Sequence, residues 1–344
     1  MGTIYFNGKD LCENFNMNVI GRGTYGAPAR DIEQVHVPGR NGDLLFDNGG
    51  FLNQTVTYPE CSILENFPFY GAQLRNFLLS APGYHELRDT YDPRYYRLAE
   101  FRGPFEPDVH TARNNDSAVF DLSFNCKPFR YLRSRYSPVI YVGGTRISRD
   151  SYVVIPASVD GSYYLSFVNN GSEAVPFTVI STDKDDRDTT LLSISVAGGA
   201  SESGEITTAS DNILYVLVRI NKTTNIEVYS GQRLIYSYNG ETGTTKLYND
   251  SFLAAAPLLT LVNFGGSIAV EEDTITIGAG YTKYSCNIDC EEYAAYSGQT
   301  SYDYALSVSG NFPSLAPGLN TIVCSAFDPT EDMYIRCASR LRYL

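Results

Sequence analysis

Three glycines near the start of the chain have the spacing of a nucleotide-binding turn. Gly21, Gly23 and Gly26 fit the pattern GxGxxG, and Asp43 follows about twenty residues later, where such folds place an acidic ribose ligand. The turn has to open a helix, because the pyrophosphate sits at the helix N-terminus. Pro28 and then strand-like residues follow instead. We therefore predict no nucleotide or other cofactor at this position.

An acidic segment in the middle of the chain has the residue types that bind calcium. Asp183, Asp185, Asp186 and Asp188 could supply oxygen ligands. Arg187 stands among them, and neither the glycine nor the distal glutamate of an EF-hand loop follows. A solvated loop accounts for the same residues, so we predict no metal site.

Several carboxylates in the first third of the chain could form the pair that a glycosidase needs. Closeness in sequence does not give their separation in space, however, and that separation decides the chemistry. The candidates are Asp89, Asp92, Glu100, Glu106 and Asp108. A serine triad has no more support, because the three histidines have no GxSxG partner. These histidines are His36, His85 and His110. We predict no catalytic residue and no enzyme activity.

The cysteines have no spacing that suggests a redox site, a disulfide framework or a zinc site. Their number is odd and none forms a CxxC pair. We predict reduced, mostly buried thiols in a protein made in the cytoplasm. They are Cys12, Cys61, Cys126, Cys286, Cys290, Cys324 and Cys337.

Length, composition and charge limit the class of protein. A chain of 344 residues fits two or three domains, since single cores stop growing at roughly 250–300 residues. With 43% apolar and 19% charged residues, the composition is that of a folded protein. The net charge of −13 argues against specific nucleic acid binding. No run approaches the roughly 18 apolar residues of a membrane helix, and the start MGTIYFNGKD lacks a signal pattern, so we expect a soluble, unexported protein without membrane insertion.

The dominant hydrophobic period is two, which predicts β-strands with alternating faces. Alternate residues from Ala118 to Cys126 are apolar, which predicts a long strand that ends at Pro128. The turn residues at 38–42 predict the tip of a hairpin. Only residues 70–79 suggest a helix, which the Ala-Pro-Gly sequence at 81–83 stops. The predicted fold class is mostly β.

Residues 147–240 predict a separate β-sandwich. Short strands recur there with turns at Asn170-Gly171 and Ser230-Gly231, and ILYVLVRI at 213–220 predicts a fully buried strand. Tyrosines in this segment could stack on sugars, but tyrosine is also common in cores and interfaces, and the chain has no Trp. They are Tyr163, Tyr164, Tyr229, Tyr236 and Tyr238. A third β unit begins after residue 247.

Six stretches carry a family resemblance, and their order and spacing matter more than any one motif. In the first domain they are VHVPGRNGDLLFDNGGF (35–51), LLSAPGYHELRDTYDPRYYRLAEF (78–101) and AVFDLSFNCKPFRYL (118–132). In the last third they are AAAPLLTLVNFGGSIAVEEDTITI (254–277), CNIDCEEYAAYSG (286–298) and GNFPSLAPGLNTIV (310–323). Together they resemble the distal tail (Dit) proteins of long-tailed phages, a siphovirus tail component.

The resemblance implies three parts. Residues 1–138 would be a ring-forming β domain with one helix, 139–146 with 241–344 a galectin-like β-sandwich, and 147–240 an inserted β-sandwich similar to carbohydrate-binding modules. It also implies a homohexameric ring in the tail of a phage or prophage virion, assembled in the bacterial host cytoplasm. The ring would join the tail tube protein to the tip or baseplate proteins. The alternative is an adhesion module that recognises a host cell-wall glycan.

Overall fold

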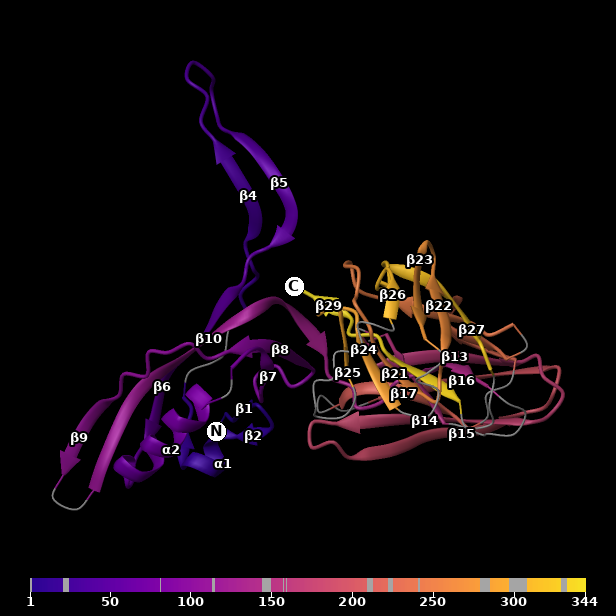
Figure 1. Cartoon of the computed structure of the whole chain (residues 1–344). Helices are drawn as coiled ribbons and strands as arrows, with labels where there is room; N and C mark the ends of the chain where they lie inside the picture. The colour runs from indigo at the N-terminus through magenta and orange to yellow at the C-terminus, as the bar shows by residue number, and fades with distance from the viewer. Residues whose placement is uncertain are drawn as a thin grey trace. The chain divides into compact units, whose positions relative to one another are not determined.

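The chain is built almost entirely from antiparallel β-strands (Figure 1), which confirms the mostly β fold class. The computed structural model describes residues 2–20, 25–80, 82–112, 115–143, 150–156, 158, 160–208, 213–221, 225–240, 242–278, 285–296, 308–328 and 333–344. It contains two compact units, Met1–Arg133 with Tyr343–Leu344, and Ser134–Arg342. Among the described residues, no helix has the length and apolar character needed to cross a membrane.

The first unit contains one large sheet, two helices and a long separate hairpin. The sheet has the order β2-β1-β7-β8-β10-β6-β3, while β9 and β29 also pair with β10. The elements are β1 (Ile4–Phe6), β2 (Lys9–Asp10), α1 (Leu11–Phe15), β3 (Met17–Asn18), β4 (Arg30–Val35), β5 (Leu44–Phe51), β6 (Gln54–Ile63), α2 (Phe67–Ser80), β7 (His85–Asp89), β8 (Tyr95–Glu100), β9 (Asp108–Ala112), β10 (Asn115–Leu132) and β29 (Arg342–Tyr343).

The core of the first unit surrounds Phe124 on β10. Its side chain is fully buried, and its ring centroid lies 4.9 Å from that of Phe6, 5.6 Å from Phe101 and 6.2 Å from Tyr58. Helix α2 packs on β6 and β10 and adds the buried Leu74 to the same core. The alternating pattern of β10 therefore places one face of that strand against the helix.

The two helices differ in how far the sequence predicts them. Helix α2 confirms the helix predicted at residues 70–79. The prediction of one helix in this unit was wrong in number, because α1 was missed. Asp10 caps α1 by accepting the backbone N–H groups of Cys12 at 2.8 Å and Glu13 at 3.0 Å, and Asn16 ends it in the left-handed conformation. A helix of five residues is too short to show a period of 3.6.

Strand β10 continues past Pro128, where the sequence predicted its end. It pairs with β6 up to Cys126, and with β8 at Asn125–Cys126 and again at Arg130–Leu132, so its register with β8 is interrupted between Cys126 and Arg130. Pro128 lies in this interruption. A proline is tolerated there because no ladder hydrogen bond requires its missing N–H.

The second unit contains three sheets. Their orders are β16-β13-β18-β19-β20-β27-β22-β23-β26, β11-β28-β21-β24-β25 and β12-β17-β14-β15. The elements are β11 (Val139–Val142), β12 (Ser151–Ile155), β13 (Ser162–Asn169), β14 (Val175–Asp183), β15 (Asp188–Val196), β16 (Ala200–Thr207), β17 (Ile213–Ile220), β18 (Ile226–Ser230), β19 (Arg233–Asn239), β20 (Thr244–Asn249), β21 (Leu258–Val262), β22 (Gly266–Val270), β23 (Asp273–Ile277), β24 (Ser285–Asp289), β25 (Ala294–Tyr296), β26 (Val308–Gly310), β27 (Gly318–Ala326) and β28 (Tyr334–Ala338).

One continuous hydrophobic core holds the sheets of the second unit together. Phe167 of β13 meets Phe177 of β14 across two sheets, with ring centroids 4.9 Å apart. Strand β17 confirms the predicted buried run, with every residue from Leu214 to Val218 buried. The long sheet continues from strands of residues 147–240 into β20 and β27 through the pairing of β19 with β20. The three predicted domain boundaries stay predictions.

Candidate functional site

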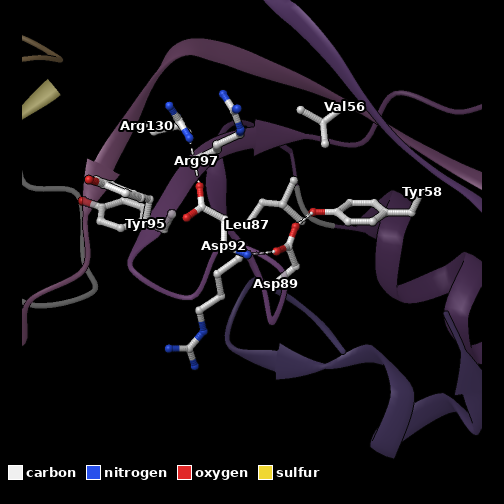
Figure 2. Close-up of a pocket in the computed structure, with 10 residues that line it drawn as sticks. Val56, Tyr58, Leu87, Asp89, Asp92, Tyr95, Arg97 and Arg130 are labelled. Carbon is white, nitrogen blue, oxygen red and sulfur yellow. Dashed lines mark hydrogen bonds and ion pairs between the residues drawn. The ribbon is translucent and has the colours of Figure 1, made fainter. Parts of the chain in front are cut away.

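A small charged pocket lies in the first unit where β6, β7, β8 and β10 meet (Figure 2). The polar side chains that line it are Tyr58, Arg88, Asp89, Asp92, Tyr95, Tyr96, Arg97 and Arg130. The cavity measures ≈ 20 Å³, enough for about one water molecule. Pockets for small molecules usually measure roughly 300–1,000 Å³. The pocket is therefore too small for a sugar or a nucleotide.

Asp89 holds together the turn between β7 and β8. Its Oδ1 accepts the backbone N–H groups of Tyr91 and Asp92, both at 2.9 Å, a common way for aspartate to fix a turn. Its Oδ2 accepts the hydroxyl proton of Tyr58 at 2.7 Å (Figure 2). Burial and the nearby charge of Asp89 raise the pKa of Tyr58 well above its usual value. The phenol therefore stays protonated and acts as a fixed donor.

Two arginines close the other side of the pocket. Arg130 Nη1 lies 3.0 Å from Asp92 Oδ2, and its guanidinium lies 5.4 Å from the centre of the Tyr95 ring. Arg97 is 7% exposed, and burial lowers its pKa. Arg130 also donates to the main-chain oxygen of Leu344. These contacts tie the β7–β8 turn to β10, which is a structural role.

Of the five candidate carboxylates, the structure brings Asp89 and Asp92 together and leaves the others apart from them. Both face a cavity that a saccharide cannot enter, and each accepts hydrogen bonds from the fold itself. Glu100 pairs with Arg102 at 2.7 Å and lies outside the pocket. The arrangement therefore offers no place for a glycosidic bond between two carboxylates.

The hairpin of β4 and β5 is a feature of a different kind, which we call the arm (residues 30–51). Among the described residues, its two strands hydrogen-bond in register only with each other, as a two-stranded sheet. The arm extends away from the body of the first unit (Figure 1), and none of its residues belongs to a hydrophobic core cluster. A two-stranded hairpin alone is at best marginally stable in water. It needs a surface to pack against.

Both faces of the arm carry exposed apolar side chains. In its register Val35 lies opposite Leu44 and Phe46 opposite Glu33, so three of these four side chains form an apolar face. On the other face Leu45 lies opposite Gln34 and Ile32 opposite Asp47. Phe46 is 53% and Leu45 62% exposed. Exposed apolar side chains grouped in this way are expected to be buried in an assembly.

The tip of the arm confirms the hairpin turn predicted at residues 38–42. Gly39 and Gly42 adopt positive φ angles of 81° and 80°, which glycine tolerates without strain. Asp43 Oδ1 lies 3.1 Å from His36 Nδ1 across the tip, and both side chains are exposed. Asp43 therefore lies at the tip of the arm.

No protein-family model matches the chain, and no curated protein matches it. Among solved structures, the chain is similar to the crystal structure of SPP1 Dit (gp 19.1), described as a paradigm of the hub adsorption apparatus in phages that infect Gram-positive bacteria. The sequence identity is 9% and the TM-score 0.42, with 100% of each chain covered. A likeness this weak supports no inference, so the proposals below rest on the residues of this chain.

Two further sequence patterns are the glycine pattern and the acidic loop. Gly21 and Gly23 lie outside the described residues, and Gly26 precedes strand β4, not a helix. In the loop, Asp183 Oδ1 accepts the N–H groups of Asp185 at 2.9 Å and Arg187 at 2.8 Å, so it fixes the turn. The described residues include no cluster of metal-binding side chains.

Asp188, at the end of this loop, joins β15 to the start of the second unit. It accepts hydrogen bonds from Tyr136 at 2.5 Å, Thr182 at 2.8 Å and Arg135 at 2.8 Å. Burial alone would raise the pKa of Asp188, but the bonds from Tyr136, Thr182 and Arg135 outweigh it and lower the pKa. The folded state therefore favours the ionised carboxylate.

Asp188→Asn is expected to make the free energy of unfolding less dependent on pH in acid. A carboxylate with a lowered pKa stabilises the fold above its unfolded pKa of about 3.9, and the effect disappears as pH falls through the lower folded value. At pH 7 the variant should lose about 1 kcal/mol of unfolding free energy, and the difference should shrink as pH falls below the unfolded pKa. Urea unfolding at several pH values measures this. Asp185→Asn is the control, and a difference that stays constant as pH falls would contradict the assignment.

The thiols and the candidate tyrosines are mostly buried. Six cysteines are buried and Cys12 is partly so, which confirms the prediction of mostly buried thiols. Burial raises the pKa of Cys61 and Cys126 to about 12, so neither supplies a thiolate at neutral pH. Among the tyrosines proposed for sugar stacking, Tyr164 is exposed and Tyr229 partly so. The other three are buried and cannot stack on a ligand: Tyr163, Tyr236 and Tyr238. Glycan recognition stays a prediction.

The sequence did not predict the polar groups that complete the pocket, namely Tyr58, Arg97 and Arg130. They come from three strands, and no local pattern connects them. The apolar arm had a signal that could have been used. Apolar residues stand at both odd and even positions around the predicted turn, in Leu44, Leu45 and Phe46, where a hairpin with one solvated face would alternate.

Proposed function

We propose that the chain is a structural subunit of a phage or prophage tail, which associates with copies of itself through the first unit. The arm is the observation that carries this proposal. It is a long ribbon with apolar side chains on both faces, and its strands pair only with each other among the described residues. Burying Val35, Leu44 and Phe46 against a second copy would stabilise the assembly by about 1.5–3 kcal/mol for each fully buried side chain.

The distribution of charge supports association through the first unit. Residues 1–133 contain 13 Lys and Arg against 16 Asp and Glu, a net charge of −3. Residues 134–342 contain 13 Lys and Arg against 23 Asp and Glu, a net charge of −10. Identical bodies with a large net charge repel each other. If two copies contact each other through their first units, the charges that meet are the smaller ones, and the repulsion is weaker than between two second units.

The stretches that resemble the distal tail proteins support the same role. The first of them spans the tip and β5 of the arm, the second the β7–β8 turn of the pocket, and the third β10. The pocket therefore joins the second and third of these stretches, and the first forms the tip and β5 of the arm. A closed ring requires contacts between unlike surfaces of neighbouring copies, and an arm that reaches out from one copy onto the next provides them. We propose six copies, with the tail tube and tip or baseplate proteins as partners, in a role that needs no catalytic residue.

Light scattering of the purified full-length protein tests the proposal. We expect a mass that rises with concentration toward six copies of the 38.1 kDa chain. Association driven by apolar burial should survive high salt, because screening weakens charge repulsion between the copies. A strict monomer across the micromolar range, at both low and high salt, would contradict self-association through the arm.

A further inference from the structure

Five asparagines of the chain are followed directly by glycine, the sequence in which asparagine deamidates fastest. Glycine lacks a Cβ, so its nitrogen approaches the preceding side chain with the least hindrance. The dipeptide is the same at all five sites, and only the structure around each of them distinguishes one from another. The sites are Asn7-Gly8, Asn41-Gly42, Asn48-Gly49, Asn170-Gly171 and Asn239-Gly240.

Deamidation at such a site has two structural requirements. The backbone nitrogen of the glycine loses its proton and attacks Cγ of the asparagine, ammonia leaves, and a cyclic succinimide forms. Water then opens this ring at either carbonyl, which gives an aspartyl or an isoaspartyl residue. The glycine N–H must therefore be free of a hydrogen bond, and the backbone must be able to rotate until the nitrogen meets Cγ.

At two of the sites the glycine N–H is already engaged. Gly49 lies within β5 and donates its N–H to Asp47 Oδ1 at 2.8 Å. Gly171 donates its N–H to Asn169 Oδ1 at 3.0 Å, and Asn169 is completely buried. Each nitrogen has to break a hydrogen bond before it can attack, so both reactions should be slow.

At two further sites the backbone of the asparagine is fixed. Asn239 is the last residue of β19, where it pairs with Thr244 and accepts the N–H of Thr242 at its Oδ1 at 3.4 Å. Asn7 lies in the tight turn between β1 and β2, with a φ of 46°, and donates its N–H to the carbonyl of Glu86 at 3.1 Å. Neither asparagine can rotate without breaking the pairing around it.

Asn41, at the tip of the arm, meets both requirements. Asn41 and Gly42 are exposed and lie between the strands β4 and β5. The turn that precedes them is closed by the N–H of Arg40, which donates to the carbonyl of Val37 at 3.2 Å. Within the described part of the chain, no hydrogen bond holds the side chain of Asn41 or the N–H of Gly42. This nitrogen can therefore lose its proton, and the segment around it can rotate.

We propose that Asn41 is the site at which this chain deamidates. The reaction consumes one water, releases one ammonia and leaves a carboxylate between Arg40 and Asp43. The isoaspartyl product also adds one methylene to the backbone of the tip. The arm therefore gains a negative charge and a longer turn, while the cores of the two units keep their residues. This change concerns a single chain, so it does not depend on self-association.

Peptide mapping by mass spectrometry tests the proposal on the full-length protein, incubated dilute in mildly alkaline buffer. Chymotrypsin separates Asn41 from Asn48, because it cleaves after Leu45 and Phe46. Asn41 should convert at least about fivefold faster than Asn48 or Asn170, since breaking one hydrogen bond before the attack slows the reaction by about this factor. Electron-transfer fragmentation should find isoaspartate as well as aspartate at position 41.

Incubation of the protein unfolded in guanidinium chloride is the matched control. All five sites then lack their structural restraints, so their rates should become similar. In the folded Asn41→Gln variant the tip peptide should stay unchanged, because glutamine has to form a larger ring. Four outcomes would overturn the proposal. Asn41 does not convert in the folded protein, Asn48 or Asn170 converts as fast, Asn41 keeps the same lead in guanidinium chloride, or the tip peptide of the variant still gains mass.

Discussion

The double variant Val35→Ser/Phe46→Ser is expected to be a folded monomer under conditions where the wild type assembles. Both side chains lie on the same face of the arm, next to Leu44 and Glu33. If each is buried in the assembly, their loss removes about 3–6 kcal/mol per interface. The self-association constant should then fall by about two to four orders of magnitude.

Light scattering of the variant beside the wild type measures this effect. The fold should not change, because both residues are exposed and belong to no core cluster of the described chain, and exposed substitutions usually change stability by less than about 0.5 kcal/mol. Phe252→Ser is the control, since it removes an even more exposed phenylalanine outside the arm. A double variant that keeps the wild-type mass would exclude this face of the arm as the interface.

Phe124→Ala is expected to have the largest effect on stability. The side chain is fully buried and meets Phe6, Tyr58 and Phe101, so its removal leaves a cavity in the centre of the first core. Substitutions of this kind cost about 3–5 kcal/mol, a large part of the 5–15 kcal/mol that stabilises a typical domain. Helix α2 and β10 would lose their common contact.

Urea unfolding followed by circular dichroism measures the loss. Phe69→Ala is the matched control, because it removes the same atoms from an exposed position outside the arm and should change the unfolding free energy by less than about 0.5 kcal/mol. A Phe124→Ala variant that unfolds at the wild-type urea concentration would contradict the placement of this ring at the centre of the core.

The elements that local sequence predicted are those whose signal lies within one segment. The alternation from Ala118 to Cys126 predicted the buried face of β10, the apolar face of residues 70–79 predicted α2, and the turn residues at 38–42 predicted the tip of the arm. Each follows from backbone geometry, since side chains alternate on a strand, repeat every 3.6 residues on a helix, and require special φ angles in a tight turn. The mostly β class follows from the sum of such signals.

The features that were missed depend on what lies beside a segment in space. Helix α1 is too short for periodicity, and its cap at Asp10 is a local signal that many loops share. Strand β10 passes through Pro128 because its pairing with β8 is interrupted there and resumes at Arg130. The pocket combines Tyr58, Asp89 and Arg130 from separate strands. The course of β10 and the pocket both require the tertiary arrangement.

The tyrosines show that local sequence does not determine which side chains of a strand are exposed. Tyr163 and Tyr164 are neighbours on β13, yet one is buried and the other exposed. The period of two determined that they lie on opposite faces, but it could not determine which face is covered. Likewise, the turn residues at 38–42 determined the tip of a hairpin. Only the tertiary structure decided that, among the described residues, the strands of the arm pair with each other alone and leave apolar side chains exposed. Local geometry sets where a side chain points, while burial depends on which distant segments pack against that face.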